Sequence, residues 1–190
     1  MSMKIRGRKI KAASFVCLVL YYGIAYWLPG SYSAIGGGIS RRFRAFLCKH
    51  IFKHCGRYVN VERKACFGSG LDIELGDESG LGINCKIPSN TKIGNYVMMG
   101  PNCYILPHNH KFDRLDIPMC KQGLSPKLRT VIEDDVWIGR DVVMTPGRTI
   151  KKGSIVGARC LLCKDFTEYA IIGGNPSKLI RYRKQTNVKS

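Results

Sequence analysis

Large aliphatic residues recur at every sixth position over most of the chain. One series begins at residue 75 and a second at residue 132, and every position of both series is Leu, Ile, Met or Val. These positions are Leu75, Leu81, Ile87, Ile93, Met99 and Ile105, then Ile132, Ile138, Met144, Ile150, Val156 and Leu162. Since only about a quarter of residues in an average protein are of these types, an unbroken run of twelve matches does not arise by chance.

A period of six predicts a triangular coil. Each hexad supplies one short strand and one turn, so three hexads close a coil of about 18 residues, and successive coils stack as parallel strands. Residues two before each aliphatic are mostly small or β-branched, which fits a tight corner. Gly follows the aliphatic at positions 76, 82, 94, 100, 139 and 157, where we expect it to tolerate the turn. The predicted fold is all-β, a parallel β-helix of about four coils preceded by an irregular coil at 57–74.

The two series are out of register, because 132 minus 105 is 27 and not a multiple of six. Residues 106–129 must therefore leave the coil as an inserted loop. This segment is polar, basic and contains Pro. An excursion from a strict solenoid is a place where function is expected.

Residues 12–28 are free of charge and follow a basic segment. Their length is at the lower limit for a membrane span. The first expectation is a helix lying in a membrane interface, the second a helix docked on the domain or on a neighbouring subunit, and the third a true span. In the first case the residues at headgroup level are Tyr21, Tyr22, Tyr26 and Trp27. A signal peptide has the same layout, but no A-x-A-like cleavage site follows.

Leu28-Pro29-Gly30 ends this helix, and residues 31–38 predict a flexible link. Residues 39–55 predict a basic amphipathic helix. Its apolar positions are Ile39, Phe43, Phe46, Leu47, Ile51 and Phe52. His50 and His54 are spaced to share a metal, but neighbouring lysines and the lack of a carboxylate argue against one. We therefore expect a helical arm over 1–56, a β-helix domain over 57–183 and a flexible tail over 184–190.

The positive charge is concentrated in the N-terminal third of the chain. The whole chain carries +18, and residues 1–64 hold 13 Lys/Arg and one acid, which leaves +12. Such a basic segment indicates an anionic partner, either a membrane surface or a phosphate-bearing ligand. Nucleic acid is not expected, because no nucleic-acid-binding motif accompanies the charge.

The nine cysteines predict neither a disulfide framework nor a zinc site. Their number is odd, and the C-L-L-C of Cys160 and Cys163 lies in an apolar run without a second pair or a nearby His. Free thiols of this kind are typical of a reducing cytoplasm.

Four further motifs lie within the repeat region: NHKFD at 109–113, IEDDVWIG at 132–139, PG at 146–147 and YAIIGGNPSKLIR at 169–181. Together with the hexads they resemble the hexapeptide-repeat acyltransferases over residues 57–183. That group includes maltose, galactoside, serine, streptogramin and chloramphenicol acetyltransferases, and capsule or colanic-acid O-acetyltransferases. The basic, apolar arm is similar to that of the polysaccharide O-acetyltransferases.

The resemblance implies a left-handed β-helix that forms a homotrimer, with each site in a groove between subunits. It implies acetyl transfer from acetyl-CoA to a hydroxyl of a carbohydrate or lipid-linked glycan, in capsule, exopolysaccharide or O-antigen synthesis. The expected location is the cytoplasm, with contact to the inner membrane surface through residues 1–56. The γ-class carbonic anhydrases share this fold but need three His around a metal. Only His108 and His110 lie in the repeat region, so no metal is expected.

The same resemblance assigns the site residues. His110 is the general base, and His108, in the same loop, is its competitor. His108, Asn84 and Asp113 are candidates for acceptor contact, and the alternative role of Asp113 is to orient the base. In the sugar-acetyltransferase branch the contacting Asn lies two residues earlier, where this chain has Gly82, so a purely structural role for Asn84 stays open.

For the donor, the resemblance places five residues along the acetyl-CoA wall: Trp137, Gly139, Ala158, Cys163 and Lys164. Lys178 and Arg181 would reach the coenzyme phosphates. Arg140 stands where the family residue is usually small, so the contact at that point differs. Two alternatives remain: an acetyltransferase for a small sugar, amino acid or antibiotic, fully active without residues 1–40, and a non-catalytic interaction protein.

Overall fold

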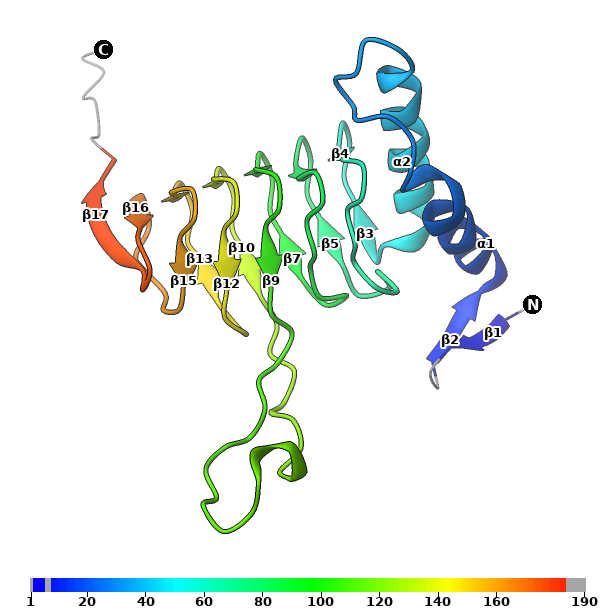
Figure 1. Ribbon diagram of the computed structural model, residues 1–190. Helices are drawn as coiled ribbons and strands as arrows, with labels where there is room; N and C mark the ends of the chain where they lie inside the picture. Colours follow the sequence, from blue (N-terminus) through cyan, green and yellow to red (C-terminus); the bar gives the residue numbers. More distant parts are fainter. Residues whose placement is uncertain (1, 6–7, 184–190) are drawn as a thin grey trace, which may run out of the picture.

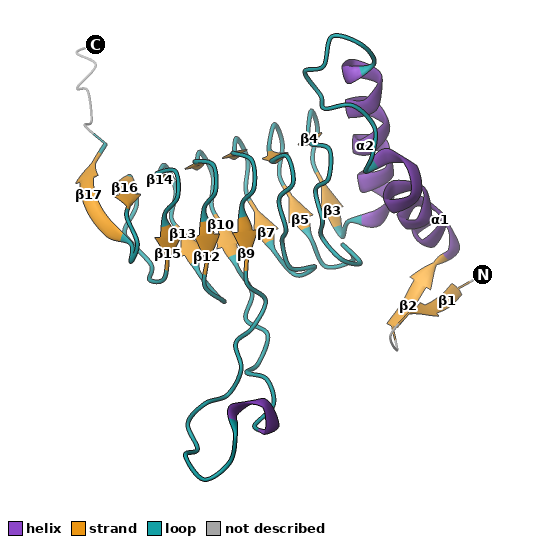
Figure 2. Cartoon of the chain, viewed as in Figure 1, coloured by secondary structure: helices purple, strands orange, loops and turns teal. Residues whose placement is uncertain are grey.

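The computed structural model describes residues 2–5 and 8–183. The tail expected at 184–190 lies outside the described residues. Most of the chain winds into stacked triangular coils whose strands run parallel (Figure 1). A helical arm covers one end of this solenoid, and a long loop leaves its side (Figure 2).

Three flanks make up the solenoid, and each flank is a ladder of short strands. The first flank consists of β3 (His54–Cys55), β5 (Glu74–Leu75), β7 (Lys92–Ile93), β10 (Val131–Ile132) and β13 (Thr149–Ile150). The second consists of β4 (Asn60–Val61), β6 (Gly80–Leu81), β8 (Met98–Met99), β11 (Trp137–Ile138), β14 (Ile155–Val156), β16 (Ala170–Gly173) and the antiparallel β17 (Lys178–Tyr182). The third consists of bridges at Cys66 and Lys86 followed by β9 (Tyr104–Ile105), β12 (Val143–Met144) and β15 (Leu161–Leu162).

The predicted hexad core is confirmed. In most of the two-residue strands the second residue faces the interior and is buried, while the first faces outward. All twelve aliphatics line this interior, and only Met99 is partly exposed. Burial of one large apolar side chain per strand, stacked on its equivalents above and below, stabilises the coils.

The glycines after the aliphatics have a different role from the one predicted. The left-handed corner positions are held mainly by other residues, including Asn84, Asn102 and Asp141. Gly82 instead lies where adjacent coils come closest, since a Cβ there would be 2.0 Å from the carbonyl oxygen of Gly100. The prediction that these glycines serve the turn is therefore wrong. They allow the backbones of neighbouring coils to pack together.

The helical arm is docked on the first coil. It begins with the hairpin β1 (Ser2–Ile5) and β2 (Arg8–Lys11), continues through α1 (Ala12–Leu20) and the π-turn η1 (Tyr21–Ala25), and ends with α2 (Gly37–Ile51). Tyr21 is fully buried and its hydroxyl donates a hydrogen bond to the carbonyl of Ala65 at 2.8 Å. The Tyr22 hydroxyl donates to Gly68 O at 2.9 Å, and both rings pack against Phe67.

This docking corrects the expectation that Tyr21 and Tyr22 lie at the level of lipid headgroups. Tyr21 and Tyr22 contact the solenoid, so they are not free to lie at the level of lipid headgroups, whereas Trp27 is exposed. Within the described part of the chain, no helix is both long and apolar enough to cross a bilayer.

The orientation of α2 agrees with the prediction in part. Its buried face contains Ser40, Arg44, Leu47 and Ile51, while Ile39 and Phe46 are 77% and 56% exposed. Leu47 and Ile51 of the predicted apolar stripe are buried, and Arg44 turns toward the solenoid beside them.

Arg44 is completely buried and joins three segments. Its guanidinium donates to Val61 O at 2.6 Å, Pro29 O at 3.0 Å and Ser31 Oγ at 3.1 Å, and it lies 3.9 Å from the Glu62 carboxylate. The Ser31 backbone N–H donates to Glu62 at 3.0 Å. The link at 31–38, predicted to be flexible, is therefore fixed to the first coil at its start.

Candidate active site

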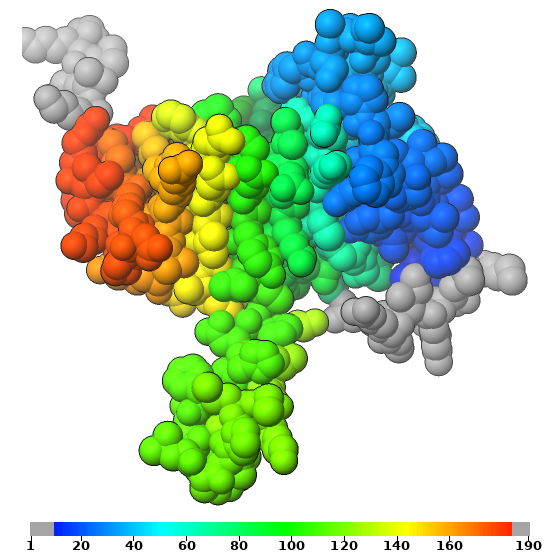
Figure 3. Space-filling model, viewed as in Figure 1, coloured from blue at the N-terminus to red at the C-terminus, as the bar shows by residue number. Residues whose placement is uncertain are grey.

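The inserted loop leaves the solenoid at the corner between the third and first flanks. It follows β9 and returns before β10, and it stands clear of the body of the molecule (Figure 3). The strands on either side keep their register, since β7 pairs with β10 and β9 with β12. The sequence prediction of an excursion at 106–129 is confirmed.

Backbone pairing in the stem of the loop fixes the position of His110. His110 and Leu124 form an antiparallel bridge, Lys111 N–H donates to Gly123 O at 3.0 Å, and Ser125 N–H donates to Asn109 O at 2.8 Å. The imidazole of His110 is exposed. An ordered backbone with a solvent-accessible imidazole suits a residue that must meet a substrate from outside the chain.

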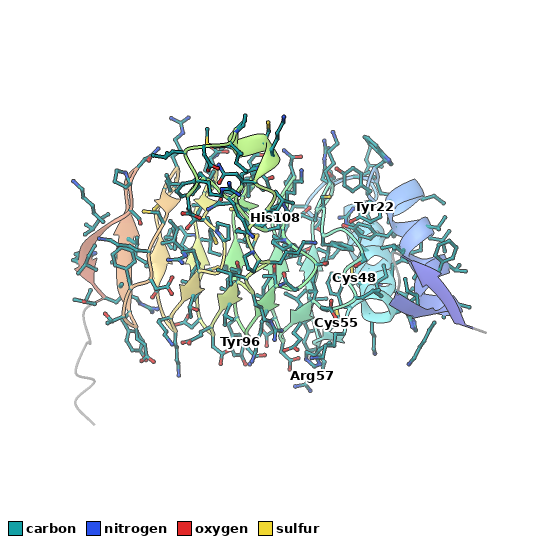
Figure 4. The ribbon with its side chains drawn as sticks, turned by 90° about the horizontal axis from the view of Figure 1, so that it is seen from below. Tyr22, Cys48, Cys55, Arg57, Tyr96 and His108 are labelled. Atoms are coloured by element: carbon teal, nitrogen blue, oxygen red, sulfur yellow. The ribbon has the colours of Figure 1, made fainter. Side chains whose placement is uncertain are left out.

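His108 has a different environment. It is partly buried, and its Nδ1 is a buried atom that no group of the described residues hydrogen-bonds. Figure 4 shows His108 toward the same side of the solenoid as Tyr22 of the arm, with Tyr96 and Arg57 toward the other side. A buried polar atom without a partner costs about 1–3 kcal/mol, so a hydrogen bond from outside the described residues would be favourable at this nitrogen.

Two acceptor candidates differ in how they are held. Asp113 is exposed and makes no hydrogen bond or ion pair within the described residues, so it does not orient His110 here. Asn84 lies at the corner between the second and third flanks and lines a cleft of about 390 Å³. Its Nδ2 donates to Asn102 Oδ1 at 3.0 Å, and Asn102 Nδ2 donates to Asp141 Oδ1 at 2.8 Å.

The donor candidates occupy several parts of the solenoid. Trp137 is exposed on the second flank between Met98 and Ile155. Gly139 and Ala158 touch at the corner that also carries Asn84, where a Cβ on Gly139 would lie 2.6 Å from the Ala158 nitrogen.

The remaining donor candidates follow β15 or lie on β17. Cys163 and Lys164 are at the corner from which the loop leaves two coils earlier. A hydrogen bond with the Ser177 hydroxyl, assisted by the charge of Lys164, lowers the pKa of the Cys163 thiol. Lys178 and Arg181 are exposed on β17.

One chain does not bring His110 and Trp137 together. The loop leaves from the corner opposite the second flank, so His110 and Trp137 lie on opposite sides of the triangular coil. Among the described residues, no three His, Cys, Asp or Glu side chains gather as a metal site would require.

The sequence prediction missed Asn102, Asp141, Lys64 and Lys86, which lie in or beside the cleft with Asn84. A signal was present, because Asn84 and Asn102 are 18 residues apart, the length of one coil, and must therefore stack.

Comparisons with known proteins agree with this architecture. No family model matches the chain. A chloramphenicol acetyltransferase of Escherichia coli is 50% identical over 146 residues, which cover 70% of this chain and 60% of that protein. Galactoside O-acetyltransferase of E. coli K12 is 29% identical over 140 residues, covering 73% and 68%. The chain spans about 60% of the length of the first curated relatives it matches.

Solved structures match over nearly the whole chain. A hexapeptide-repeat-containing acetyltransferase from Vibrio cholerae has a TM-score of 0.73 at 25% identity and covers 92% of both chains. The structure of that protein with acetyl-CoA has a TM-score of 0.67 at 26% identity, covering 91% of this chain and 86% of the other. In its repeat, its loop and these relatives the chain is similar to the hexapeptide-repeat acyltransferases, and it shares the left-handed parallel β-helix of their solved structures.

Proposed function

We propose that this protein transfers an acetyl group from acetyl-CoA to a hydroxyl of a sugar, with His110 as the general base. The observation that carries the proposal is the exposed imidazole of His110, fixed by its backbone on the stem of the loop. Its support is the similarity to a family in which a solved relative holds acetyl-CoA.

The chemistry requires little from the protein. Neutral His110 removes the proton of the acceptor hydroxyl as that oxygen attacks the thioester carbonyl. The tetrahedral intermediate then collapses, its carbon–sulfur bond breaks, and the leaving sulfur of coenzyme A takes the proton from the imidazolium. The imidazole returns to its neutral form, so no further reactant is needed.

The site is completed by a second copy of the chain in a homotrimer. His110 and Trp137 lie on opposite sides of one solenoid, so the loop of one subunit would reach the flank of its neighbour. Met98 and Trp137 are 61% and 51% exposed on that flank, and assembly would cover them. The same assembly, or the acceptor itself, would supply a partner for His108 Nδ1.

The acceptor class is tested by turnover with acetyl-CoA, followed as release of the free thiol. The acceptor panel contains sugars, nucleotide sugars, lipid-linked glycans, free amines and chloramphenicol. Chloramphenicol is included because a 50% identical relative is a chloramphenicol acetyltransferase, and it represents the small-molecule alternative. We expect kcat/KM for a sugar hydroxyl to exceed that for chloramphenicol at least about tenfold, a difference of about 1.4 kcal/mol in transition-state binding. Turnover restricted to amines or to chloramphenicol would contradict a sugar acceptor.

Cys163 offers a test of the donor wall. Because its thiol pKa is lowered, more of it is thiolate near neutral pH than for Cys103 or Cys160, whose pKa values burial raises to about 11. Iodoacetamide should therefore label Cys163 before those two, and more slowly as the pH falls. Acetyl-CoA should slow the labelling of Cys163 and leave exposed Cys120 unaffected, as read by mass spectrometry. An unchanged labelling rate would remove Cys163 from the donor wall.

The arm is proposed to contact the anionic inner surface of the cytoplasmic membrane. It exposes Val16, Val19, Ile24 and Trp27, and its basic sequence holds no acid before the buried Glu62. Co-sedimentation with phosphatidylglycerol vesicles but not with phosphatidylcholine vesicles is the expected result, and equal behaviour with both would contradict the contact. Deletion of residues 1–40 is not a clean test, because it removes Tyr21 from the core.

A further inference from the structure

The cleft on the third flank lies where the arm meets the first coils. It is open to solvent, has a volume of about 390 Å³ and takes side chains from the arm and from three successive coils. Its principal lining residues are Tyr26, Lys64, Asn84, Lys86, Asn102 and Tyr104. Tyr104 belongs to β9, the strand that leads directly into the loop bearing His110. The cleft is therefore at the root of the catalytic loop.

The charge of the cleft is positive and not neutralised. Lys64 and Lys86 are its charged residues, no carboxylate lines it, and neither lysine forms an ion pair within the described part of the chain. Aromatic rings hold both side chains, with Lys64 Nζ 5.4 Å from the centre of the Trp27 ring and Lys86 Nζ 5.2 Å from that of Tyr104. Two unpaired ammonium groups in a concave surface attract an anion such as a phosphate.

A hydrogen-bonded series of three side chains fixes the orientation of the Asn84 amide in the same cleft. The Asp141 carboxylate only accepts hydrogen bonds, because Asn102 and the charges of Arg140 and Arg159 hold its pKa below the usual range. Asn102 must therefore turn its Nδ2 toward Asp141 and its Oδ1 toward Asn84. Asn84 donates a hydrogen bond from its Nδ2 to Asn102. Asn84 Oδ1 then has no partner among the described residues. That oxygen can accept a hydrogen bond from a hydroxyl.

We propose that this cleft binds the acceptor as a glycosyl phosphate. Lys64 and Lys86 bind the phosphate, and Asn84 Oδ1 accepts a hydrogen bond from a sugar hydroxyl, while Asn102 and Asp141 are positioning residues that orient the Asn84 amide. The assignment rests on the acetyl transfer proposed above and adds the class of acceptor. Nucleotide sugars and lipid-linked glycans share the glycosyl phosphate group, and free sugars lack it.

The test is calorimetric titration of the full chain without acetyl-CoA. The probes are glucose, glucose 1-phosphate, UDP-glucose and a farnesyl-diphosphate-linked glucose, of which the last two distinguish the nucleotide from the lipid source. We expect the phosphorylated probes to bind at least about tenfold more tightly than glucose, and this advantage to shrink as salt screens the charges. Equal affinity for the phosphorylated and neutral probes, or binding of none, would overturn the proposal.

Two variants separate the two contacts. The double variant Lys64→Gln/Lys86→Gln should weaken the binding of the phosphorylated probes alone. Asp141→Asn should weaken the binding of glucose and of glucose 1-phosphate by the same factor. Lys92→Gln is the matched control, since Lys92 is an exposed lysine at the equivalent position of a strand on the first flank. Equal melting temperatures show that the variants are folded, and a loss of phosphate preference in Lys92→Gln would overturn the assignment to the cleft.

Turnover distinguishes this proposal from the function on which it rests. If glucose 1-phosphate binds as expected but no sugar is acetylated, the proposed function fails and the cleft assignment stands. If neutral sugars are acetylated and the phosphate confers no advantage in KM, the cleft assignment fails alone.

Discussion

His110→Ala is expected to lower kcat by about two to four orders of magnitude, the usual effect of removing a general base. The substituted loop should keep its shape, because the pairing of the stem uses the backbone of residues 109, 111, 123 and 125 and not the imidazole. Free-thiol release at saturating acetyl-CoA measures the effect. His108→Ala is the control and should lower kcat far less. A large loss in His108→Ala together with near-normal turnover in His110→Ala would assign the base to His108.

Subunit mixing extends this test. Trp137→Ala changes a proposed donor-wall residue on the flank opposite the loop, so Trp137→Ala and His110→Ala alter different faces of one chain. If each site is shared between copies, co-expressed variant chains form some intact sites, and activity partly returns. Activity that stays at the level of the separate variants would show that each chain forms its site alone.

Arg44→Ala is expected to lower the free energy of unfolding by about 3–5 kcal/mol, because it leaves buried groups without their partner. Val61 O and Pro29 O would lose their donor, and the carboxylate of Glu62 would lose the nearby positive charge. Chemical denaturation at neutral pH measures the change. Arg42→Ala, two residues along the same helix and exposed, should change stability by less than about 0.5 kcal/mol. A loss below about 1 kcal/mol in Arg44→Ala would show that the arm is not anchored through this residue.

The solenoid was predictable because its period is set locally. One inward side chain per hexad and a coil of three hexads fix the positions from Leu75 to Leu162, and the shift of register fixes the loop. The role of Gly82 was not predictable from its own neighbours, because the close contact is with Gly100, one coil away. The burial of Arg44 on α2 escaped prediction for a similar reason. Arg44 looks like a surface residue until Val61, Pro29 and Ser31 surround it.

The candidate site was predictable in part. The NHKFD motif identifies His110 as the candidate base, and the backbone pairing in the stem of the loop explains why His110 is held in place. The orientation of Asn84 depends on Asn102 and Asp141 in later coils, and the cleft depends on Tyr26 from the arm. These contacts arise only when the coils stack and the arm docks. The proposed donor residues are dispersed over one chain, so a single copy does not bring them together.

The point of insertion of the loop has a consequence for how such proteins diversify. Residues 106–129 leave and re-enter at one corner, and the ladders on both sides continue without a shift. Changes in the length of such a segment cost little in loop-closure entropy and disturb few buried contacts. Insertions, deletions and exchanges in the loop can therefore accumulate while the scaffold stays the same. Selection for new acceptors can act on the loop without having to rebuild the coils that support it.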